Sequence, residues 1–335
     1  MEEILVCENL TMTFNDGEYI VHALKNVSFS LHKNEVLGII GESGSGKSTI
    51  AKLITGLYQP TGGNIFLDGR SIVRLKRQAQ KEVYTKVQMV FQDAVGSFNP
   101  RRKIGESISD TLCRLCGEKK HTAGKEAARL LEDVGLPGDY AEKYPHELSG
   151  GMRQRVMIAM ALACEPDILI ADEPTTALDV TIQAQILELM KDLQKKLGMA
   201  IILITHDLGV VAGMCDEIIV MYAGRIVERG TVDMIFYAPK HEYTKGLLRS
   251  IPNSSVQKER LKPISGSPVD LLSMPDGCAF APRCDNAMKI CLSQVPEGME
   301  VEPGHISACW LNVLEAIKRG DNATAGETQT PAKEE

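Results

Sequence analysis

The sequence predicts an α/β fold in which helices cover a mostly parallel β-sheet. Residues 36–40 form a short apolar run that ends in a glycine-rich loop, and a helix is expected to begin near Lys47. Two more apolar runs, residues 168–171 and 201–205, alternate with helical segments. Buried strands that alternate with helices are typical of parallel sheets, because the crossover helices cover both faces. Residues 4–31 instead alternate apolar and polar around a turn at residues 15–17, which favours an antiparallel β-subdomain.

The remaining chain divides by its composition. Helical periodicity runs through about residues 100–165, so we expect a helical subdomain inserted into an α/β unit of residues 1–240. Residues 241–319 are richer in proline, serine and glycine and lose regular periodicity, which defines a C-terminal extension. Residues 320–335 are small, polar and charged, a composition typical of disorder.

Composition also limits the function. The 335 residues are 44% hydrophobic and 24% charged, as in soluble globular proteins. No apolar run reaches the ~18–20 residues that span a bilayer, and the acidic start at Met1-Glu2-Glu3 lacks a signal-peptide core. A net charge of −7 argues against nucleic acid as the ligand. We therefore expect a cytosolic chain, unless a partner holds it at a membrane.

A phosphate-binding loop follows the first buried strand. The segment from Gly41 to Ser48 fits the pattern G-x-x-x-x-G-K-[ST] in full, between a predicted strand and a predicted helix. Glycines let backbone N–H groups surround phosphate oxygens, Lys47 neutralises the β- and γ-phosphates, and Ser48 offers its hydroxyl to Mg²⁺. We therefore expect ATP and Mg²⁺ to bind here, at Gly41, Glu42, Ser43, Gly44, Ser45, Gly46, Lys47, Ser48 and Thr49.

Two carboxylates end the apolar run at residues 168–171. Asp172 is placed to hold Mg²⁺ through water, and Glu173 to act as the general base on the attacking water. A strand that ends in Asp-Glu is weak evidence alone, because many such strand ends are merely solvated. It becomes strong evidence beside the phosphate-binding loop.

A third motif distinguishes among the enzymes that share this loop. Leu148, Ser149, Gly150, Gly151 and Met152 precede a predicted helix, whose N-terminus favours anions. The segment resembles the signature motif of ABC ATPases. The resemblance implies that this signature contacts the γ-phosphate of an ATP bound to an opposing subunit.

Other motifs of this family follow in order over residues 4–235. Gln92 resembles the Q-loop glutamine that joins Ser48 and Asp172 around Mg²⁺. Ala177-Leu178-Asp179 resembles the D-loop, and His206 the switch histidine that acts with Glu173 in catalysis. Phe14 resembles the aromatic residue that stacks on adenine, with Tyr19 as a rival.

A narrower resemblance covers nearly the whole chain. The sequence is similar to the D-type ATPase subunits of oligopeptide and dipeptide importers, in residues 149–178, 241–244, 247–248, 251–252, 266–268 and 277–284. It departs from them at Glu242, where the family usually has proline, and in residues 93–100. The resemblance implies a head-to-tail dimer with a related F-type ATPase, two transmembrane permease subunits, an extracytoplasmic binding protein and a place on the cytoplasmic face of the membrane.

Other functions compete with peptide import. The same importer class carries nickel, an opine or glutathione, and cargo is chosen by subunits absent from this chain. A soluble ABC ATPase of DNA repair, translation or cluster assembly is the alternative of another class. The interval between Lys47 and Ser149 has no sustained heptads, and the chain has one cassette, both of which argue against it.

Four of the nine cysteines group near the C-terminus. Cys278, Cys284, Cys291 and Cys309 are spaced C-x5-C-x6-C-x17-C, and a reducing cytosol argues against disulfides. Structural zinc prefers short C-x2–4-C pairs, so these spacings favour a [4Fe–4S] cluster, as does the resemblance. Zn²⁺, with His305 replacing one ligand, and four unrelated cysteines are the alternatives.

The cluster is expected to order the extension, at a place remote from ATP. Little periodicity is visible in the extension, so a metal centre would supply order that apolar burial does not. A redox-sensing role is the alternative. Cys113 and Cys116 form a C-x2-C pair without a second pair, and we interpret them as structural.

Overall fold

A computed structural model describes residues 2–92, 96–176, 178–250 and 264–319. It confirms the α/β class, with an eight-stranded sheet of order β11-β12-β10-β9-β3-β8-β7-β6 and a four-stranded antiparallel sheet of order β2-β1-β4-β5. Part of the segment after Gln92, Ala177 of the D-loop, the pair at residues 251–252 and the tail at 320–335 lie outside the described residues.

The strands divide between the two sheets. The smaller sheet contains β1 (Glu3–Asn15), β2 (Ile20–His32), β4 (Gly62–Leu67) and β5 (Arg70–Ser71). The larger sheet contains β3 (Val36–Ile40), β6 (Val87–Val90), β7 (Ile168–Asp172), β8 (Ala200–Ile204), β9 (Glu217–Tyr222), β10 (Arg225–Thr231), β11 (Met299–Glu302) and β12 (His305–Ser307).

The helices form three groups along the chain. The first group is α1 (Lys47–Ile54) and α2 (Arg77–Lys86). The second lies between β6 and β7 and contains α3 (Ile104–Thr111), η1 (Leu112–Cys116), α4 (Lys120–Asp133), η2 (Gly138–Glu142), η3 (Pro145–Glu147) and α5 (Gly150–Leu162). The third contains α6 (Val180–Leu197), α7 (Leu208–Met214), α8 (Val232–Tyr237), α9 (Glu242–Arg249), η4 (Ala281–Arg283), α10 (Lys289–Ser293) and α11 (Trp310–Arg319).

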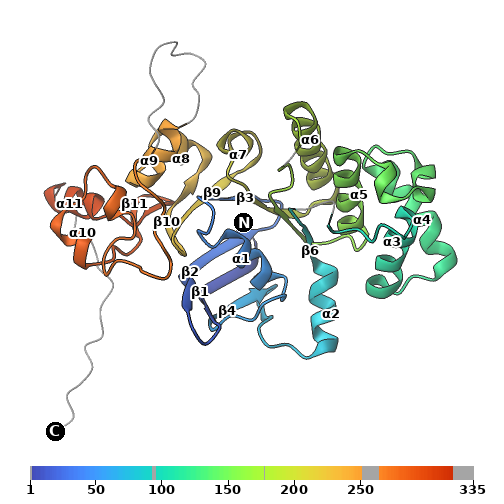
Figure 1. The fold of residues 1–335 in the computed structure, drawn as a ribbon, viewed down its shortest axis with the longest axis horizontal. Coiled ribbons are helices and arrows are strands. Elements are labelled where there is room, and N and C mark those ends of the chain that lie inside the picture. The colour runs from blue at the N-terminus through green and yellow to red at the C-terminus, as the bar shows by residue number, and fades with distance from the viewer. Residues whose placement is uncertain (1, 93–95, 177, 251–263, 320–335) are drawn as a thin grey trace, which may run out of the picture.

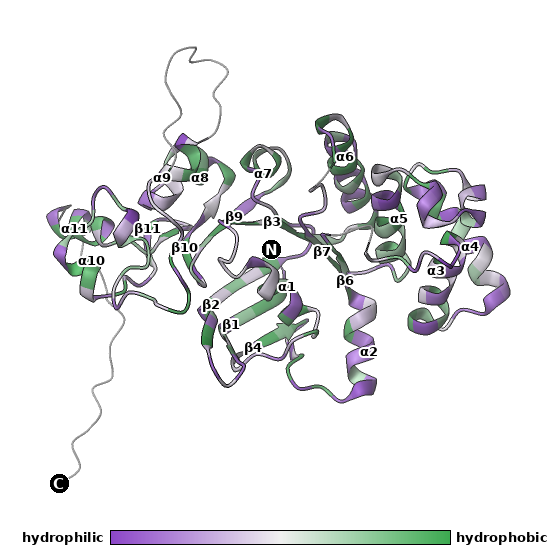
Figure 2. Ribbon diagram, in the orientation of Figure 1, coloured by the Kyte–Doolittle hydropathy of each residue, from purple (hydrophilic) through white to green (hydrophobic). Residues whose placement is uncertain are grey.

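The central strands place the loops of interest at one edge. β9, β3, β8, β7 and β6 are parallel neighbours. Every residue of β3, β7 and β8 is buried, and Figure 2 shows this part of the sheet as hydrophobic. In parallel strands the carboxyl ends share an edge. The segments after Val90, Ile40, Asp172 and Ile204 therefore gather there.

The helices between β6 and β7 form a layer beside the sheet. Their core includes Ile104, Leu131 and Val156, each inaccessible to solvent, and it continues onto α6 through Ile186. Figure 1 places α3, α4 and α5 at one end of the molecule and β11, α10 and α11 at the other. Helices thus occupy the stretch between β6 and β7, and its role as an inserted subdomain stays a prediction.

The extension has more regular structure than the sequence indicates. β12 pairs antiparallel with β10, through Glu228↔Ser307 and Arg229↔Ile306, and so extends the main sheet. Little periodicity is visible in its sequence because β11, β12, η4 and α10 have only three to five residues each, too few to show a period. Sheet pairing supplies order that propensity does not.

No helix within the described ranges is both long and apolar enough to cross a membrane.

Candidate functional site

The phosphate-binding loop joins β3 to α1, and its lysine side chain forms hydrogen bonds with the backbone of the same loop. Lys47 Nζ donates to the carbonyl oxygens of Gly41 (2.7 Å) and Glu42 (2.8 Å). Burial lowers the pKa of Lys47, while the carboxylates nearby oppose that shift. Gly41 has φ +151°, and a Cβ there would lie 2.2 Å from the carbonyl oxygen of Met221. Only glycine fits this turn.

Ser48 and Asp172 meet where β7 ends beside the start of α1. Ser48 Oγ donates to Asp172 Oδ1 at 3.0 Å. Burial raises the pKa of Asp172, and the bond from Ser48 acts in the opposite direction. A hydroxyl and a carboxylate at this distance are oxygen ligands of the kind that Mg²⁺ prefers. The structure therefore brings together two of the three predicted Mg²⁺ ligands.

Glu173 lies in contact with other side chains that the sequence predicts to act in the site. Its carboxylate accepts hydrogen bonds from Gln92 Nε2 (2.8 Å) and Thr176 Oγ1 (2.9 Å). His206 Nδ1 lies 3.3 Å from the same carboxylate. Gln92 thus contacts Glu173, and no hydrogen bond joins it to Ser48 or Asp172 among the described residues. Sequence reasoning missed Thr176, which no spacing rule singles out.

The backbone of Glu173 is strained. Its φ of +49° lies in the left-handed region, which costs a non-glycine residue roughly 1–3 kcal/mol. Its N–H donates to the carbonyl oxygen of Ile204 at 2.8 Å, which fastens the turn to β8. This turn directs the carboxylate toward Gln92 and His206.

The signature residues pack against the D-loop side of α6. Ser149 caps α5, its Oγ accepting from Met152 N at 3.3 Å, and Asp179 caps α6 by accepting from Ile182 N at 3.0 Å. A Cβ on Gly151 would lie 2.5 Å from Cγ2 of Ile182. In the described part of the chain no hydrogen bond joins residues 148–152 to the phosphate-binding loop, and Figure 1 shows α5 apart from α1.

Comparisons with known proteins agree with these motifs. The family model described as "ABC transporter" matches residues 24–176, and "Oligopeptide/dipeptide transporter, C-terminal region" matches residues 227–291. The chain is 47% identical to the dipeptide transport ATP-binding protein DppD of Bacillus subtilis, over 93% of this chain and 95% of that protein. It is 50% identical to the oligopeptide transport ATP-binding protein OppD of the same species, over 92% and 88%. The chain belongs to the ATP-binding subunits of oligopeptide and dipeptide ABC transporters.

A solved structure extends the likeness to the fold. The dimeric ATP-binding cassette MJ0796, in a post-hydrolysis state bound to ADP and Pi, matches with a TM-score of 0.62 and 32% identity. The match covers 68% of this chain and 99% of that one. This ATP-binding subunit therefore shares the fold of an ABC ATPase cassette.

The aromatic residues expected near adenine are both on the surface. Phe14 is 38% exposed and Tyr19 50% exposed. The ring of Phe14 meets Tyr58 edge-on, with centroids 5.5 Å apart. The choice between Phe14 and Tyr19 as the stacking residue stays a prediction.

The extension reaches the phosphate-binding loop. Both guanidinium NH₂ groups of Arg283 donate to Glu42, at 2.6 and 2.9 Å, and the backbone N–H of Glu42 donates to the hydroxyl of Tyr243 at 2.8 Å. The expectation that the cysteine-bearing segment is remote from ATP is therefore wrong. Arg283 and Glu42 are 241 positions apart, so no sequence spacing could reveal their contact.

The four grouped cysteines line one small cavity. Cys278, Cys284, Cys291 and Cys309 surround a space of about 20 Å³ together with His241 and Trp310. Among the described residues, however, no group of three or more His, Cys, Asp or Glu side chains is arranged to hold a metal ion. Neither the [4Fe–4S] cluster nor Zn²⁺ is thus supported by a formed site.

Two other cysteine and histidine expectations change. His305 does not face the cysteines; its Nε2 lies 2.8 Å from Glu228 Oε1, and both side chains are fully buried. Cys113 packs against the helical core. Cys116 instead lies beside Cys164, with 3.2 Å between the two Sγ atoms.

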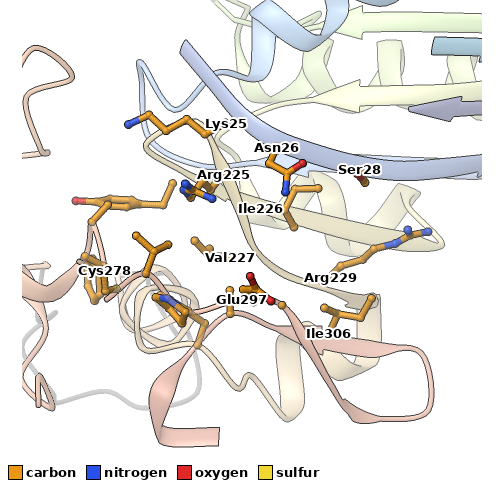
Figure 3. A pocket seen from close by; sticks show the side chains of 18 residues that line it. Lys25, Asn26, Ser28, Arg225, Ile226, Val227, Arg229, Cys278, Glu297 and Ile306 are labelled. Carbon is orange, nitrogen blue, oxygen red and sulfur yellow. The ribbon is translucent and has the colours of Figure 1, made fainter. Parts of the chain in front are cut away.

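A larger cavity, of about 660 Å³, lies between β2, β10 and the extension. Lys25 and Arg225 enter it from the two strands, and Cys278 and Glu297 from the extension (Figure 3). Burial lowers the pKa of both Lys25 and Arg225, and their mutual repulsion adds to the shift of Lys25. Two basic side chains thus share this wall of the cavity.

Proposed function

We propose that this subunit powers the import of dipeptides or oligopeptides by binding and hydrolysing MgATP in residues 41–49 and at the edge of the sheet beside them. One observation carries the proposal. The Ser48–Asp172 pair lies next to the strained turn at Glu173, whose carboxylate already contacts Gln92 and His206. Residues 1–240 would form the nucleotide-binding unit and residues 241–319 the extension.

Each of these residues has a chemical role in the proposal. Lys47 exchanges its carbonyl partners for the β- and γ-phosphates, since its amine lies within the same loop. Glu173 takes the proton of the water that attacks the γ-phosphorus, and His206 and Gln92 hold that carboxylate in place. Ser48 and Asp172 would hold Mg²⁺, which neutralises charge that develops on the phosphates.

The general base is tested by Glu173→Gln. The amide keeps the size and hydrogen-bonding of the side chain but does not accept the proton, so ATP hydrolysis should fall roughly 10²–10⁴-fold while ATP binding persists. Glu188→Gln on the exposed side of α6 is the matched control. Hydrolysis by the assembled transporter at the unmodified rate with Glu173→Gln would refute this role.

The geometry of the signature supports an opposing ATPase subunit as a partner. Ser149 and its neighbours are bonded to their own helix and α6 and lie apart from the phosphate-binding loop, so we assign them to the ATP of an opposing subunit. An F-type ATPase is the proposed head-to-tail partner, with two permease subunits that hold the pair at the cytoplasmic face of the membrane. The isolated chain should then hydrolyse ATP slowly, and adding the F-type subunit and permeases should raise the rate.

Peptide cargo is supported by the relatives named for dipeptide and oligopeptide transport. The test is ATPase stimulation of the reconstituted transporter by its binding protein loaded with a defined ligand. Dipeptides or oligopeptides should stimulate. Stimulation by nickel, an opine or glutathione alone would reassign the cargo, and full activity without any permease would favour a soluble ATPase.

We also propose that the four-cysteine cavity holds a [4Fe–4S] cluster. Support comes from the donor set, since four thiols from separate turns line one space without a competing disulfide. A cluster there would tie η4, α10 and the start of α11 together. Protein purified without oxygen should contain roughly four iron and four sulfide per chain, and Cys291→Ser should lose them while Cys113→Ser keeps them. Stoichiometric zinc without iron would overturn the cluster but not the four-thiol site, and absence of both metals would overturn both.

A further inference from the structure

Glu42, the second residue of the phosphate-binding loop, is held by the extension through its side chain. The carboxylate pairs with the guanidinium of Arg283 by two hydrogen bonds of 2.6 and 2.9 Å. The Arg283 side chain is 6% exposed and that of Glu42 24%. Two parallel bonds between these planar groups fix their relative orientation as well as their distance.

The backbone of Glu42 is held as well. Its N–H donates to the Tyr243 hydroxyl at 2.8 Å, and its carbonyl oxygen accepts from Lys47 Nζ at 2.8 Å. Tyr243 is fully buried, and burial raises its pKa, so the hydroxyl stays neutral. One residue thus connects the extension to the lysine proposed to bind phosphate.

Arg283 is itself firmly placed. Its Nε donates to the carbonyl oxygen of Ser265 at 3.1 Å, and a terminal nitrogen donates to the Tyr222 hydroxyl at 3.2 Å. Tyr222, Tyr243 and Phe280 form an aromatic group with centroids 4.6 to 5.4 Å apart. The guanidinium therefore keeps its position without help from a ligand.

The charge of Glu42 makes this contact consequential for nucleotide binding. An unpaired carboxylate in a phosphate-binding loop repels the phosphates, most strongly where water is excluded. Resting on the nucleotide site proposed above, we infer that Arg283 is a positioning residue for ATP. It neutralises Glu42 and holds the loop in the form that admits phosphate.

The contact also links ATP binding to the cysteine cavity. Arg283 is the last residue of η4, and Cys284 follows it directly. Cys278 and Cys284 pack against the same apolar cluster as Tyr243 and Phe280. We therefore expect a displacement of Cys284 to shift Arg283, the partner of Glu42.

The experiment titrates the full-length chain with ATP, ADP and AMP in the presence of Mg²⁺. Arg283→Ala should weaken ATP binding about tenfold, the effect of losing one charge-assisted contact. The loss should be smaller for ADP and absent for AMP. Glu42→Gln in the Arg283→Ala background should restore ATP affinity to within about threefold, because no lone carboxylate then remains. Arg229→Ala, which breaks the matched two-bond pair with Glu217, should leave the affinities unchanged.

Each outcome of these titrations either supports or overturns the role of Arg283 in ATP binding. Unchanged ATP affinity in a folded Arg283→Ala chain overturns the inference. Equal losses for ATP, ADP and AMP without rescue by Glu42→Gln also overturn it, because they indicate general damage to the extension. If Arg283→Ala fails to fold, Arg283→Lys serves as the second variant, because it keeps the charge but loses one hydrogen bond. Arg283→Lys should weaken ATP binding about threefold. Unchanged ATP affinity in Arg283→Lys would count against the inference. Lys47→Ala tests the proposed nucleotide site separately from the role of Arg283. If the Lys47→Ala variant still binds ATP tightly, the proposed nucleotide site itself is refuted.

Discussion

Glu228 fastens the extension to the main sheet, and replacing it with alanine should lower the free energy of unfolding by about 4 kcal/mol. Its fully buried carboxylate accepts hydrogen bonds from the backbone N–H groups of Lys240 (2.6 Å) and His241 (3.0 Å) and from His305 Nε2 (2.8 Å). Each stranded buried donor costs about 1–3 kcal/mol, so three give roughly 3–9 kcal/mol. Entry of water into the space left behind favours the lower part of that range.

Equilibrium unfolding in urea measures this effect, with tryptophan fluorescence as the probe. Trp310 is the single tryptophan and begins α11 in the extension, so its signal reports on the region that Glu228 holds. Glu217→Ala is the matched control on the neighbouring strand, where the ion pair with Arg229 is 17–18% exposed. It should cost less than Glu228→Ala, because the Glu217–Arg229 pair keeps partial contact with water. Equal losses in the two variants, or a loss below about 1 kcal/mol for Glu228→Ala, would refute the reasoning.

Two further predictions concern the phosphate-binding loop and the neighbouring cysteines Cys116 and Cys164. Gly41→Ala should abolish ATP binding in a direct titration, since its Cβ would lie 2.2 Å from the Met221 carbonyl oxygen, whereas Gly44→Ala, with no atom within 4 Å of its Cβ, should cost less affinity. Cys116 and Cys164, with Sγ atoms 3.2 Å apart, should form a disulfide when diamide accepts two protons and two electrons from the pair of thiols. Thiol titration should then count two thiols fewer, and Cys116→Ser should prevent the loss of the pair; an unchanged thiol count would contradict this.

The parts of the site that the sequence predicts correctly depend on local order. A strand, a glycine loop and a helix in succession place Lys47, and a strand end places Asp172 and Glu173. Parallel pairing then brings the strand ends together, because all crossovers return to the same edge. The contact between Ser48 and Asp172 follows from those two facts.

Other features depend on contacts between distant segments. Gln92 is predicted beside Mg²⁺ ligands, yet it donates to Glu173, a choice set by side-chain rotamers after β6 and β7 are paired. The extension reads as irregular because β12 has three residues and gains its order from β10. His305 is a possible metal ligand in the sequence because it lies near the grouped cysteines. In the structure, its side chain is instead buried against the carboxylate of Glu228.

Polar contacts join the extension to the rest of the chain at two places. Glu228 attaches it to the sheet at one side, and Arg283 joins it to the phosphate-binding loop at the other. Tyr222, which accepts a hydrogen bond from Arg283, packs against Tyr243 with centroids 4.6 Å apart, and such close packing limits movement of the contact. The Arg283 contact uses charge, so its effect on ATP should weaken at high salt less than that of a surface pair, since the Arg283 side chain is 6% exposed. Salt titrations of ATP affinity with and without Arg283 would separate this buried coupling from the general attraction between cations and phosphate.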